Sequence, residues 1–292
     1  MKETNLNRKP FFISMAIIMY AIVGNAQVNS IDYFRQKPPG YYPEVFAPEI
    51  FNKSNEWGPV FSPDGNELFY TWQNPNGSQD YHIYSMKKTD GVWSSPKLAS
   101  FTDKNGRAEL EPNFTPDGKR LYFDSERSGG FGGADIWYVE KTDTGWSAPV
   151  NAGATINTAS NDNFPSFARD GSMFFCSDRK NGNWDIDIYY AKLESGKFLT
   201  PVRLSDSINT PNWDACPTPI GDMLIFESTP KGGFGKGDIC FSPIVGNSFG
   251  KTGVMSPIFN TDKSEIGIVL SPDGKYLFFK HFQENNTYWI DA

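Results

Sequence analysis

The sequence predicts an all-β fold, a five-bladed β-propeller of four-stranded blades, closed by an N-terminal strand that completes the C-terminal blade. Three observations support this prediction. One turn motif recurs five times along the 292 residues, and each unit holds four strand-like pieces without a helical period. In addition, the N-terminal region contains a segment that can supply the strand missing from the last unit. Units of this kind, covered on both faces and placed side by side, form the blades of a propeller.

The repeated turn is clearest in "FTPDGKRLYFDSER", residues 114–127. Proline presets φ, aspartate bonds the nearby backbone, and glycine accommodates a positive φ, so this motif predicts a tight turn between two strands. The spacings between the closing glycines are 53, 53, 50 and 53 residues. These glycines are Gly65, Gly118, Gly171, Gly221 and Gly274.

The second unit illustrates the four expected strands. Pro112–Thr115 is the first, and Leu121–Phe123 is the second, whose consecutive apolar residues require a cover on both faces. After the glycine-rich loop "SGGFGGAD", Ile136–Val139 is the third strand. A turn with Trp146 and then Pro149 lead into a fourth, more polar strand, which suits an outer edge that faces water.

The last unit ends before its fourth strand, whereas the segment "GYYPEVFAPEIFN", residues 40–52, is left over near the N-terminus. Pro43 precedes Glu56 by 13 residues, the same spacing that separates Pro96 from Glu109. The stretch "PEIFNKSNE" is also similar to "SPIFNTDKSE" in the last connection. We therefore predict that the N-terminal strand completes the C-terminal blade and leaves no free sheet edge.

The beginning of the chain has the pattern of a secretory signal peptide. A basic start precedes an apolar run over residues 11–23, and Gly24-Asn25-Ala26 offers a small-residue cleavage site. The run is too short to span a membrane as a helix. We expect a signal peptide at 1–26, a leader at 27–39, a single propeller domain at 40–292, and a secreted or periplasmic location.

The formal net charge of −7 argues against nucleic acid and anionic membrane surfaces as partners, because both attract cationic proteins. It favours cationic partners or divalent ions. The three cysteines, Cys176, Cys216 and Cys240, are an odd number, whereas disulfide frameworks use even numbers. We expect them to be small buried side chains.

Several motifs resemble the TolB-type propeller family, whose repeats are WD-like in architecture. They are the turn motif, the element Ser125-Glu126-Arg127 with its copy Ser177-Asp178-Arg179, and the following "ADIWY" and "IDIYY". The resemblance covers all five units. It implies the fold but says little about activity, since the family includes periplasmic partner-binding propellers and propeller domains attached to peptidases.

Connections in a propeller alternate between its two faces, so the links between blades and the glycine-rich loops share one face. This face varies most between units, and we predict that it holds the ligand. An acidic residue lies where the chain enters the central strand in four of the five units; these residues are Glu56, Glu109, Asp162 and Glu265. In the fourth unit Asn212 takes this place, and Asp214 follows two residues later. Three interpretations are open: the carboxylates cap backbone amides between blades, they hold a cation in the channel, or two of them form a catalytic pair.

Aromatic residues are expected on the same face, where exposed rings can anchor proteins or stack on sugars. The alternative is that they fold back over the blade core. These residues are Trp72, Phe131, Trp184, Trp213, Phe234 and Phe282. His281 is added to the tentative ligand-binding set because it breaks the repeat at a position where three other units carry serine.

Arg127 and Arg179 lie across the glycine-rich loops from Asp135 and Asp187, so we expect an ion pair within each hairpin. No G-x-S-x-G, H-E-x-x-H, C-x-x-C or calcium-loop pattern occurs. The sequence thus predicts no catalytic residues, no metal ligands and no cofactor. We expect a module that binds a protein or a carbohydrate ligand, without a membrane span. The alternative is a carboxylate-dependent glycoside hydrolase or lyase at the channel mouth, which needs two carboxyl groups about 5 to 9.5 Å apart.

Overall fold

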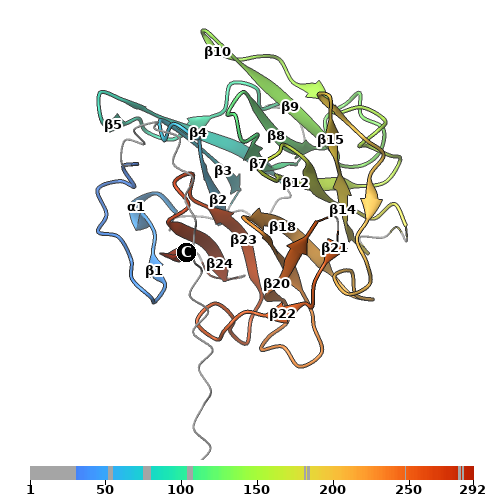
Figure 1. The fold of residues 1–292 in the computed structure, drawn as a ribbon. Coiled ribbons are helices and arrows are strands. Elements are labelled where there is room, and N and C mark those ends of the chain that lie inside the picture. Colours follow the sequence, from blue (N-terminus) through green and yellow to red (C-terminus); the bar gives the residue numbers. More distant parts are fainter. Residues whose placement is uncertain are drawn as a thin grey trace, which may run out of the picture.

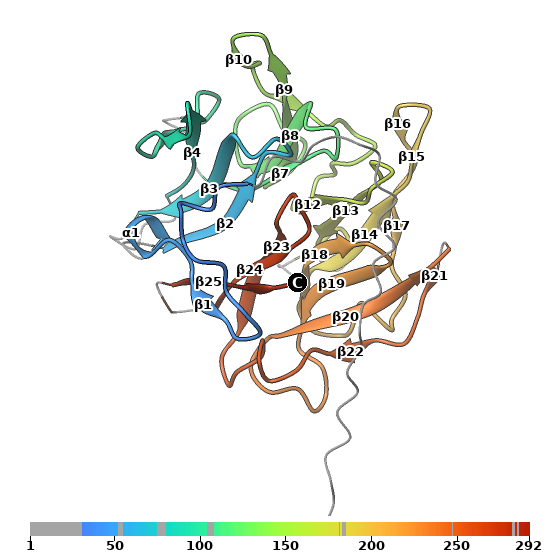
Figure 2. The ribbon, with the colours of Figure 1, turned by 60° about the vertical axis from the view of Figure 1, so that its left-hand side comes forward.

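The computed structural model describes residues 31–51, 55–74, 80–103, 108–180, 182, 185–246, 248–281, 284 and 286–292. Within these residues the chain forms five antiparallel blades around a central axis (Figure 1). The first strands of successive blades contact one another all the way round, and Figure 2 shows them grouped at the centre. The predicted fold class, a five-bladed propeller, is confirmed. The expected signal peptide lies outside the described residues.

Each blade runs from an inner strand at the axis to a short outer strand. Blade 1 contains β2 (Asn55–Phe61), β3 (Glu67–Gln73), β4 (Tyr81–Thr89), β5 (Val92–Trp93) and β6 (Lys97–Leu98). Blade 2 contains β7 (Glu109–Phe114), β8 (Arg120–Ser125), β9 (Asp135–Thr142), β10 (Gly145–Trp146) and β11 (Val150–Asn151). Blade 3 contains β12 (Asp162–Phe167), β13 (Met173–Ser177), β14 (Asp187–Ala191) and β17 (Val202–Arg203), with the small hairpin β15 (Leu193–Glu194) and β16 (Lys197–Phe198).

Blade 4 contains β18 (Asp214–Ile220), β19 (Met223–Ser228), β20 (Asp238–Val245), β21 (Ser248–Phe249) and β22 (Gly253–Val254). Blade 5 contains β23 (Glu265–Leu270), β24 (Tyr276–His281), β25 (Thr287–Asp291) and β1 (Glu44–Val45). The fourth strands are only two residues long. In blades 1 to 3 the residue before this strand is a proline, which has no amide hydrogen for the ladder.

The ring is closed by the N-terminal strand, as the sequence predicts. Glu44 lies opposite Trp289 and Val45 opposite Tyr288, so β1 is the outer strand of blade 5. The Phe46 amide donates to the Thr287 carbonyl at 2.8 Å. One turn of helix, α1 (Pro48–Phe51), then connects this strand to blade 1.

The segment 31–39, expected to be a leader outside the propeller, also contributes to the core. Ile31 and Tyr33 are buried in a cluster with residues of blades 1 and 5, including Phe61 and Phe278. The Tyr33 hydroxyl donates to Asp273 at 2.9 Å. This segment therefore runs across the seam that β1 closes.

The second strands are buried on both faces, which explains their consecutive apolar residues. Leu121 and Phe123 pack in a cluster with Phe69 of blade 1. Tyr122, between them, packs on the other side with Met173 and its neighbours in blade 3. Because side chains alternate along a strand, one strand contributes to two interblade cores.

Every inner strand carries a bulge at the same place, and the residue there has a positive φ. Glycine occupies this position in blades 1 and 5, but other residues occupy it elsewhere; the five are Gly58, Glu111, Phe164, Cys216 and Gly267. In blade 2 the bulge turns the Glu111 amide toward blade 1, where Thr71 Oγ1 accepts it at 3.1 Å. The bulges thus connect neighbouring blades close to the axis.

Candidate functional site at the loop face

The blade links and the glycine-rich loops lie at one end of the propeller, which we call the loop face. The register places Glu109, at the start of β7, opposite Ser125, and Ser125 opposite Asp135 at the start of β9. The Pro-Asp-Gly turns lie at the other end, which we call the turn face. The sequence-predicted acidic residues therefore share the loop face with the glycine-rich loops.

All five predicted acidic residues lie at the start of an inner strand and are buried, namely Glu56, Glu109, Asp162, Asp214 and Glu265. In three blades the carboxylate binds a threonine four residues earlier, in the blade link. Asp162 Oδ2 accepts from the Thr158 amide at 2.6 Å and from its hydroxyl at 2.9 Å. The equivalent pairs are Thr210–Asp214 and Thr261–Glu265. These three carboxylates cap the links between blades.

Arg127 and Arg179 each bind one of these acids. This differs from the sequence prediction, in which they pair with Asp135 and Asp187. Arg179 donates to Asp162 Oδ1 at 2.5 Å and to the Ile156 carbonyl at 2.6 Å. Arg127 likewise binds Glu109, beside the Phe101 carbonyl. Each arginine therefore joins the start of its own blade to the preceding link, a partner that is distant in sequence.

The aspartates at the start of the third strands hold the glycine-rich loops instead. Asp135 Oδ2 accepts from the Phe131 amide at 2.6 Å, and Asp238 accepts from the Phe234 amide at 3.0 Å. Asp187 differs, because its carboxylate binds Arg203 at 2.6 and 2.8 Å. In blades 2 and 4 the aspartate thus fixes a loop that carries a phenylalanine.

The predicted aromatic residues fall into different environments. Phe131 and Phe234 are 51% and 49% exposed, and Trp213 is 44% exposed. Trp72 is partly buried and packs against Tyr84, with ring centroids 5.4 Å apart. Trp184 and Phe282 lie outside the described residues. Among the described residues, the exposed aromatic side chains of this face are therefore two loop phenylalanines and one tryptophan in a blade link.

His281 ends β24, opposite Glu265. Its Nδ1 lies 3.4 Å from Glu284 Oε2, and its ring lies 4.7 Å from that of Tyr288. Within the described part of the chain, neither its Nε2 nor Glu265 Oε2 has a hydrogen-bond partner. The imidazole is therefore packed into blade 5 between two carboxyl groups.

A second set of polar residues, which sequence reasoning missed, lies just inside this face. It occupies one position in every second strand, immediately before the residue that pairs with the acid. The set consists of Thr71, Asp124, Cys176, Glu227 and Lys280, all of them buried. The sequence signal is a position whose chemistry changes in every unit while its flanks repeat.

The surroundings of these buried groups shift the pKa values of several of them. Burial raises the pKa of Glu227 to about 8, and the charges of Glu111 and Glu265 act in the same direction. Burial also raises the pKa of Asp124 well above its usual value, again with a contribution from Glu111. For Lys280 burial lowers the pKa, opposed by Glu56. Since Glu111 acts on groups in two different blades, these carboxyl groups share the interior near the axis.

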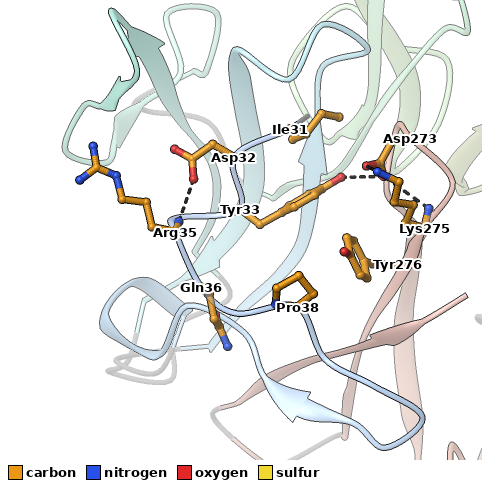
Figure 3. Close-up of a pocket in the computed structure, with 9 residues that line it drawn as sticks. All are labelled: Ile31, Asp32, Tyr33, Arg35, Gln36, Pro38, Asp273, Lys275 and Tyr276. Carbon is orange, nitrogen blue, oxygen red and sulfur yellow. Dashed lines mark hydrogen bonds and ion pairs between the residues drawn. The ribbon is translucent and has the colours of Figure 1, made fainter. Parts of the chain in front are cut away.

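A cavity of about 320 Å³ lies at the turn face, away from the predicted ligand site (Figure 3). Tyr33 and Pro38 of the N-terminal segment form one side, and Asp273 and Tyr276 of blade 5 form the other. Figure 3 shows the Tyr33 side chain pointing toward Asp273 across this cavity. The cavity is therefore part of the seam between the N-terminal segment and the last blade.

Within the described ranges, no group of three or more His, Cys, Asp or Glu side chains is arranged to hold a metal ion. None of the helices in the described part of the chain is long and apolar enough to cross a membrane. The three cysteines are free, and burial raises the pKa of the Cys240 thiol to about 12.

No protein-family model matches the sequence, and no curated protein matches it significantly. Solved structures do resemble the fold. TolB from Acinetobacter baumannii aligns with a TM-score of 0.51 at 17% identity, over 82% of this chain and 55% of that one, so the chain spans about half of TolB. An α-L-arabinofuranosidase from Lactobacillus brevis aligns with a TM-score of 0.53 at 12% identity, over 83% and 93% of the two chains. A nidogen/laminin complex aligns with a TM-score of 0.50 at 11% identity, over 82% and 76%.

Proposed function

We propose that this chain, which has the propeller fold of TolB-type structures, is a binding module that holds a protein partner on its loop face. We also propose that it acts outside the cytoplasm, in the periplasm or as a secreted protein, after removal of residues 1–26. The observation that carries the proposal is the construction of the loop face, where exposed aromatic rings stand on loops fixed by buried carboxylates. Aromatic side chains are enriched at protein interfaces, and tryptophan is among the residues that most often dominate the binding energy there.

The construction of the loops favours binding because it limits the entropy lost when a partner docks. The Phe131 and Phe234 backbones are held by hydrogen bonds from their own amides to Asp135 and Asp238. Their side chains remain about half exposed. Among the similar structures, the nidogen/laminin complex is by its name a protein–protein complex, which is consistent with a propeller that binds a protein.

A carboxylate-dependent glycoside hydrolase or lyase is the alternative, and the similar arabinofuranosidase is by its name a glycosidase. Against it, Asp162, Asp214 and Glu265 bind backbone amides of the blade links, and Arg127 binds Glu109. Carboxylates used in this way stabilise the blade links and are poorly placed to meet a substrate. The predicted cation in the channel would also have to displace these bonds.

The test compares three forms of the chain that starts at Gln27. They are the unchanged protein, a loop-face variant with Phe131→Ala, Trp213→Ala and Phe234→Ala, and a control with Tyr41→Ala and Tyr42→Ala. Tyr41 and Tyr42 are exposed but precede β1, close to the end of β25 at the turn face. Each immobilised form is incubated with envelope extract of the encoding organism, and bound proteins are quantified by mass spectrometry.

We expect at least one protein to be retained by the unchanged chain and by the control, and lost from the loop-face variant. A glycan array and a panel of aryl glycosides are measured with the same three forms. Loop-dependent glycan binding would move the proposal to a carbohydrate partner, and glycoside cleavage would favour the enzyme. Retention that is the same for all three forms would contradict the proposal.

A further inference from the structure

The two phenylalanine loops have the same design but different charge. Blade 2 carries Ser128-Gly129-Gly130-Phe131-Gly132-Gly133, and blade 4 carries Lys231-Gly232-Gly233-Phe234-Gly235-Lys236. Both phenylalanines are about half exposed, at 51% and 49%. The chain thus contains two copies of one aromatic platform, and only the copy in blade 4 is flanked by lysines.

Both loops are held in the same way. Asp238 accepts from the amides of Phe234 and Gly235, at 3.0 and 3.2 Å. Asp135 does the same for Phe131 and Gly132, at 2.6 and 3.2 Å. The backbone of each loop is therefore fixed by a buried aspartate at the start of the next strand.

The glycine after each phenylalanine is required by close packing against the next blade link. A Cβ at Gly235 would lie 2.1 Å from the Lys263 carbonyl oxygen, and one at Gly132 would lie 2.2 Å from the Ser160 carbonyl oxygen. The Lys236 amide also donates to the Lys263 carbonyl at 2.8 Å. Each phenylalanine ring thus lies on a loop that is hydrogen-bonded to a buried aspartate and packed closely against the next blade link.

The two lysines of the blade 4 loop are exposed, and within the described residues neither makes an ion pair. Asp238, the carboxylate of this loop, is buried and occupied by backbone amides. The neighbouring Lys263 is neutralised by Glu284. Lys231 and Lys236 are therefore exposed lysines without an ion-pair partner among the described residues, on either side of an exposed ring, in a chain with a net charge of −7.

We propose that the Phe234 loop docks an acidic segment of a partner protein, in which an apolar side chain covers the ring and flanking carboxylates meet Lys231 and Lys236. This proposal rests on the binding function proposed above and specifies the chemistry of the partner. The apolar contact supplies affinity, and the two lysines supply charge complementarity, which speeds association and excludes basic segments. The Phe131 loop offers only the apolar contact.

A protein segment fits this loop better than the other anionic candidates. Phenylalanine has no polar group and lysine only donates hydrogen bonds, so the side chains of the loop between Lys231 and Lys236 offer no acceptor for sugar hydroxyls. An anionic membrane would repel the net negative charge of the whole molecule. Carboxylates beside an apolar side chain match both parts of the loop.

The experiment pans a phage library of random peptides against the chain that starts at Gln27, and measures selected peptides by fluorescence polarisation. Four variants are compared with the unchanged chain. They are Phe234→Ala, Lys231→Ala with Lys236→Ala, Phe131→Ala as the matched loop without lysines, and Tyr41→Ala as a surface control. Sodium oligogalacturonate and vesicles of phosphatidylglycerol with phosphatidylcholine are tested as other anionic probes. Thermal unfolding confirms that each variant is folded.

We expect the selected peptides to carry Asp or Glu around an apolar residue, and their affinity to fall as salt is raised. Phe234→Ala should weaken binding by about tenfold or more, as truncation of an interface anchor does. The lysine variant should weaken it and flatten the salt dependence, whereas Tyr41→Ala should leave it unchanged. Phe131→Ala, which removes a ring that has no lysines beside it, should weaken binding of these peptides less than Phe234→Ala does and should leave the salt dependence as it is.

Three results would overturn the inference and are distinguishable from one another. Peptides that bind through Phe131 or Trp213 without acidic residues would remove the role of the blade 4 loop but keep the loop face as a binding site. Failure of every peptide to bind would count against both proposals. Binding of oligogalacturonate or of the vesicles that depends on Phe234, without acidic peptides, would assign the loop to that other anionic surface.

Discussion

At the residue scale, the buried acids of the loop face have a structural function that their sequence positions alone do not reveal. Asp162 is fully buried and joins the Thr158 amide, the Thr158 hydroxyl and Arg179. The carboxylate makes all of these hydrogen bonds, so the aliphatic part of the side chain contributes little to them. The residue therefore connects the link between blades 2 and 3 to the start of blade 3 through polar contacts.

We expect Asp162→Ala to lower the free energy of unfolding by about 3 kcal/mol or more, because Arg179 is left largely buried without its partner. Asp206→Ala is the matched control. It also removes a carboxylate that pairs with an arginine, Arg203, but the Asp206 side chain is exposed. We expect the control to change stability little. Urea denaturation measures both, and equal losses would contradict a special role of the buried pair.

The carboxyl groups near the axis make stability depend on pH. The pKa of Glu227 is about 8 in the folded chain and 4.5 without these surroundings. Folding therefore favours the protonated form of Glu227. The contribution of this group to the free energy of unfolding is complete below the ordinary pKa and is lost as pH rises through about 8. Asp124, whose pKa is also raised by burial, acts in the same direction.

We expect the unchanged chain to be less stable at pH of about 8.5 than at about 5, and Glu227→Gln to reduce that difference by at most roughly 4 kcal/mol. Exposed Glu44→Gln is the control and should leave the pH dependence as it is. Urea denaturation at both pH values provides the measurement. A Glu227→Gln profile that follows the unchanged chain would show that this carboxyl group is not buried as described.

At the element scale, β1 stabilises the molecule through the side chains that follow it. Phe46 is fully buried, with ring centroids 4.7 Å from Phe278 and 5.1 Å from Trp289. These two residues belong to β24 and β25. The segment that follows β1 is therefore packed into the last blade of the propeller.

We expect Phe46→Ala to cost about 3 to 5 kcal/mol of unfolding free energy, the usual effect of removing a buried ring. Tyr41→Ala, at a residue that is 84% exposed, should cost little. Chemical denaturation distinguishes them. Similar small effects for both variants would mean that β1 does not pack into blade 5.

The loop of blade 4 is a second element whose geometry can be tested. A Cβ at Gly235 would collide with backbone at 2.1 Å, whereas one at Gly237 would meet the Ser264 hydroxyl at 3.3 Å. We expect Gly235→Ala to cost about 1 to 3 kcal/mol and to displace Phe234, with a smaller effect for Gly237→Ala. Thermal unfolding and peptide binding give the readouts. A Gly235→Ala chain as stable as Gly237→Ala would contradict the close packing of this loop.

At the scale of the whole molecule, the number of blades and their closure could be predicted because the Pro-Asp-Gly turns are local signals. A turn is determined by three or four adjacent residues, so it can be recognised from the sequence alone. The match between residues 40–52 and the other blade links placed β1 correctly. The two-residue length of the outer strands was not apparent from their composition.

Features that depend on distant partners were not predicted. The burial of Ile31 and Tyr33 is set by contacts with blades 1 and 5, and no repeat includes these residues. The expected pairing of Arg127 with Asp135 was wrong because Glu109 is brought next to Arg127 by the ladder of β7 and β8. The bulges at Glu111, Phe164 and Cys216 have no local signature, since left-handed residues other than glycine are recognised only from coordinates.

Closure of the ring by β1 is the claim on which the loop face depends, and hydrogen–deuterium exchange tests it most directly. In the chain that starts at Gln27, we expect the Phe46 amide, which donates to Thr287, to exchange as slowly as amides of β24 and β25. Exchange of residues 44–46 as fast as that of an unstructured peptide, with β25 still protected, would contradict the closed five-bladed ring.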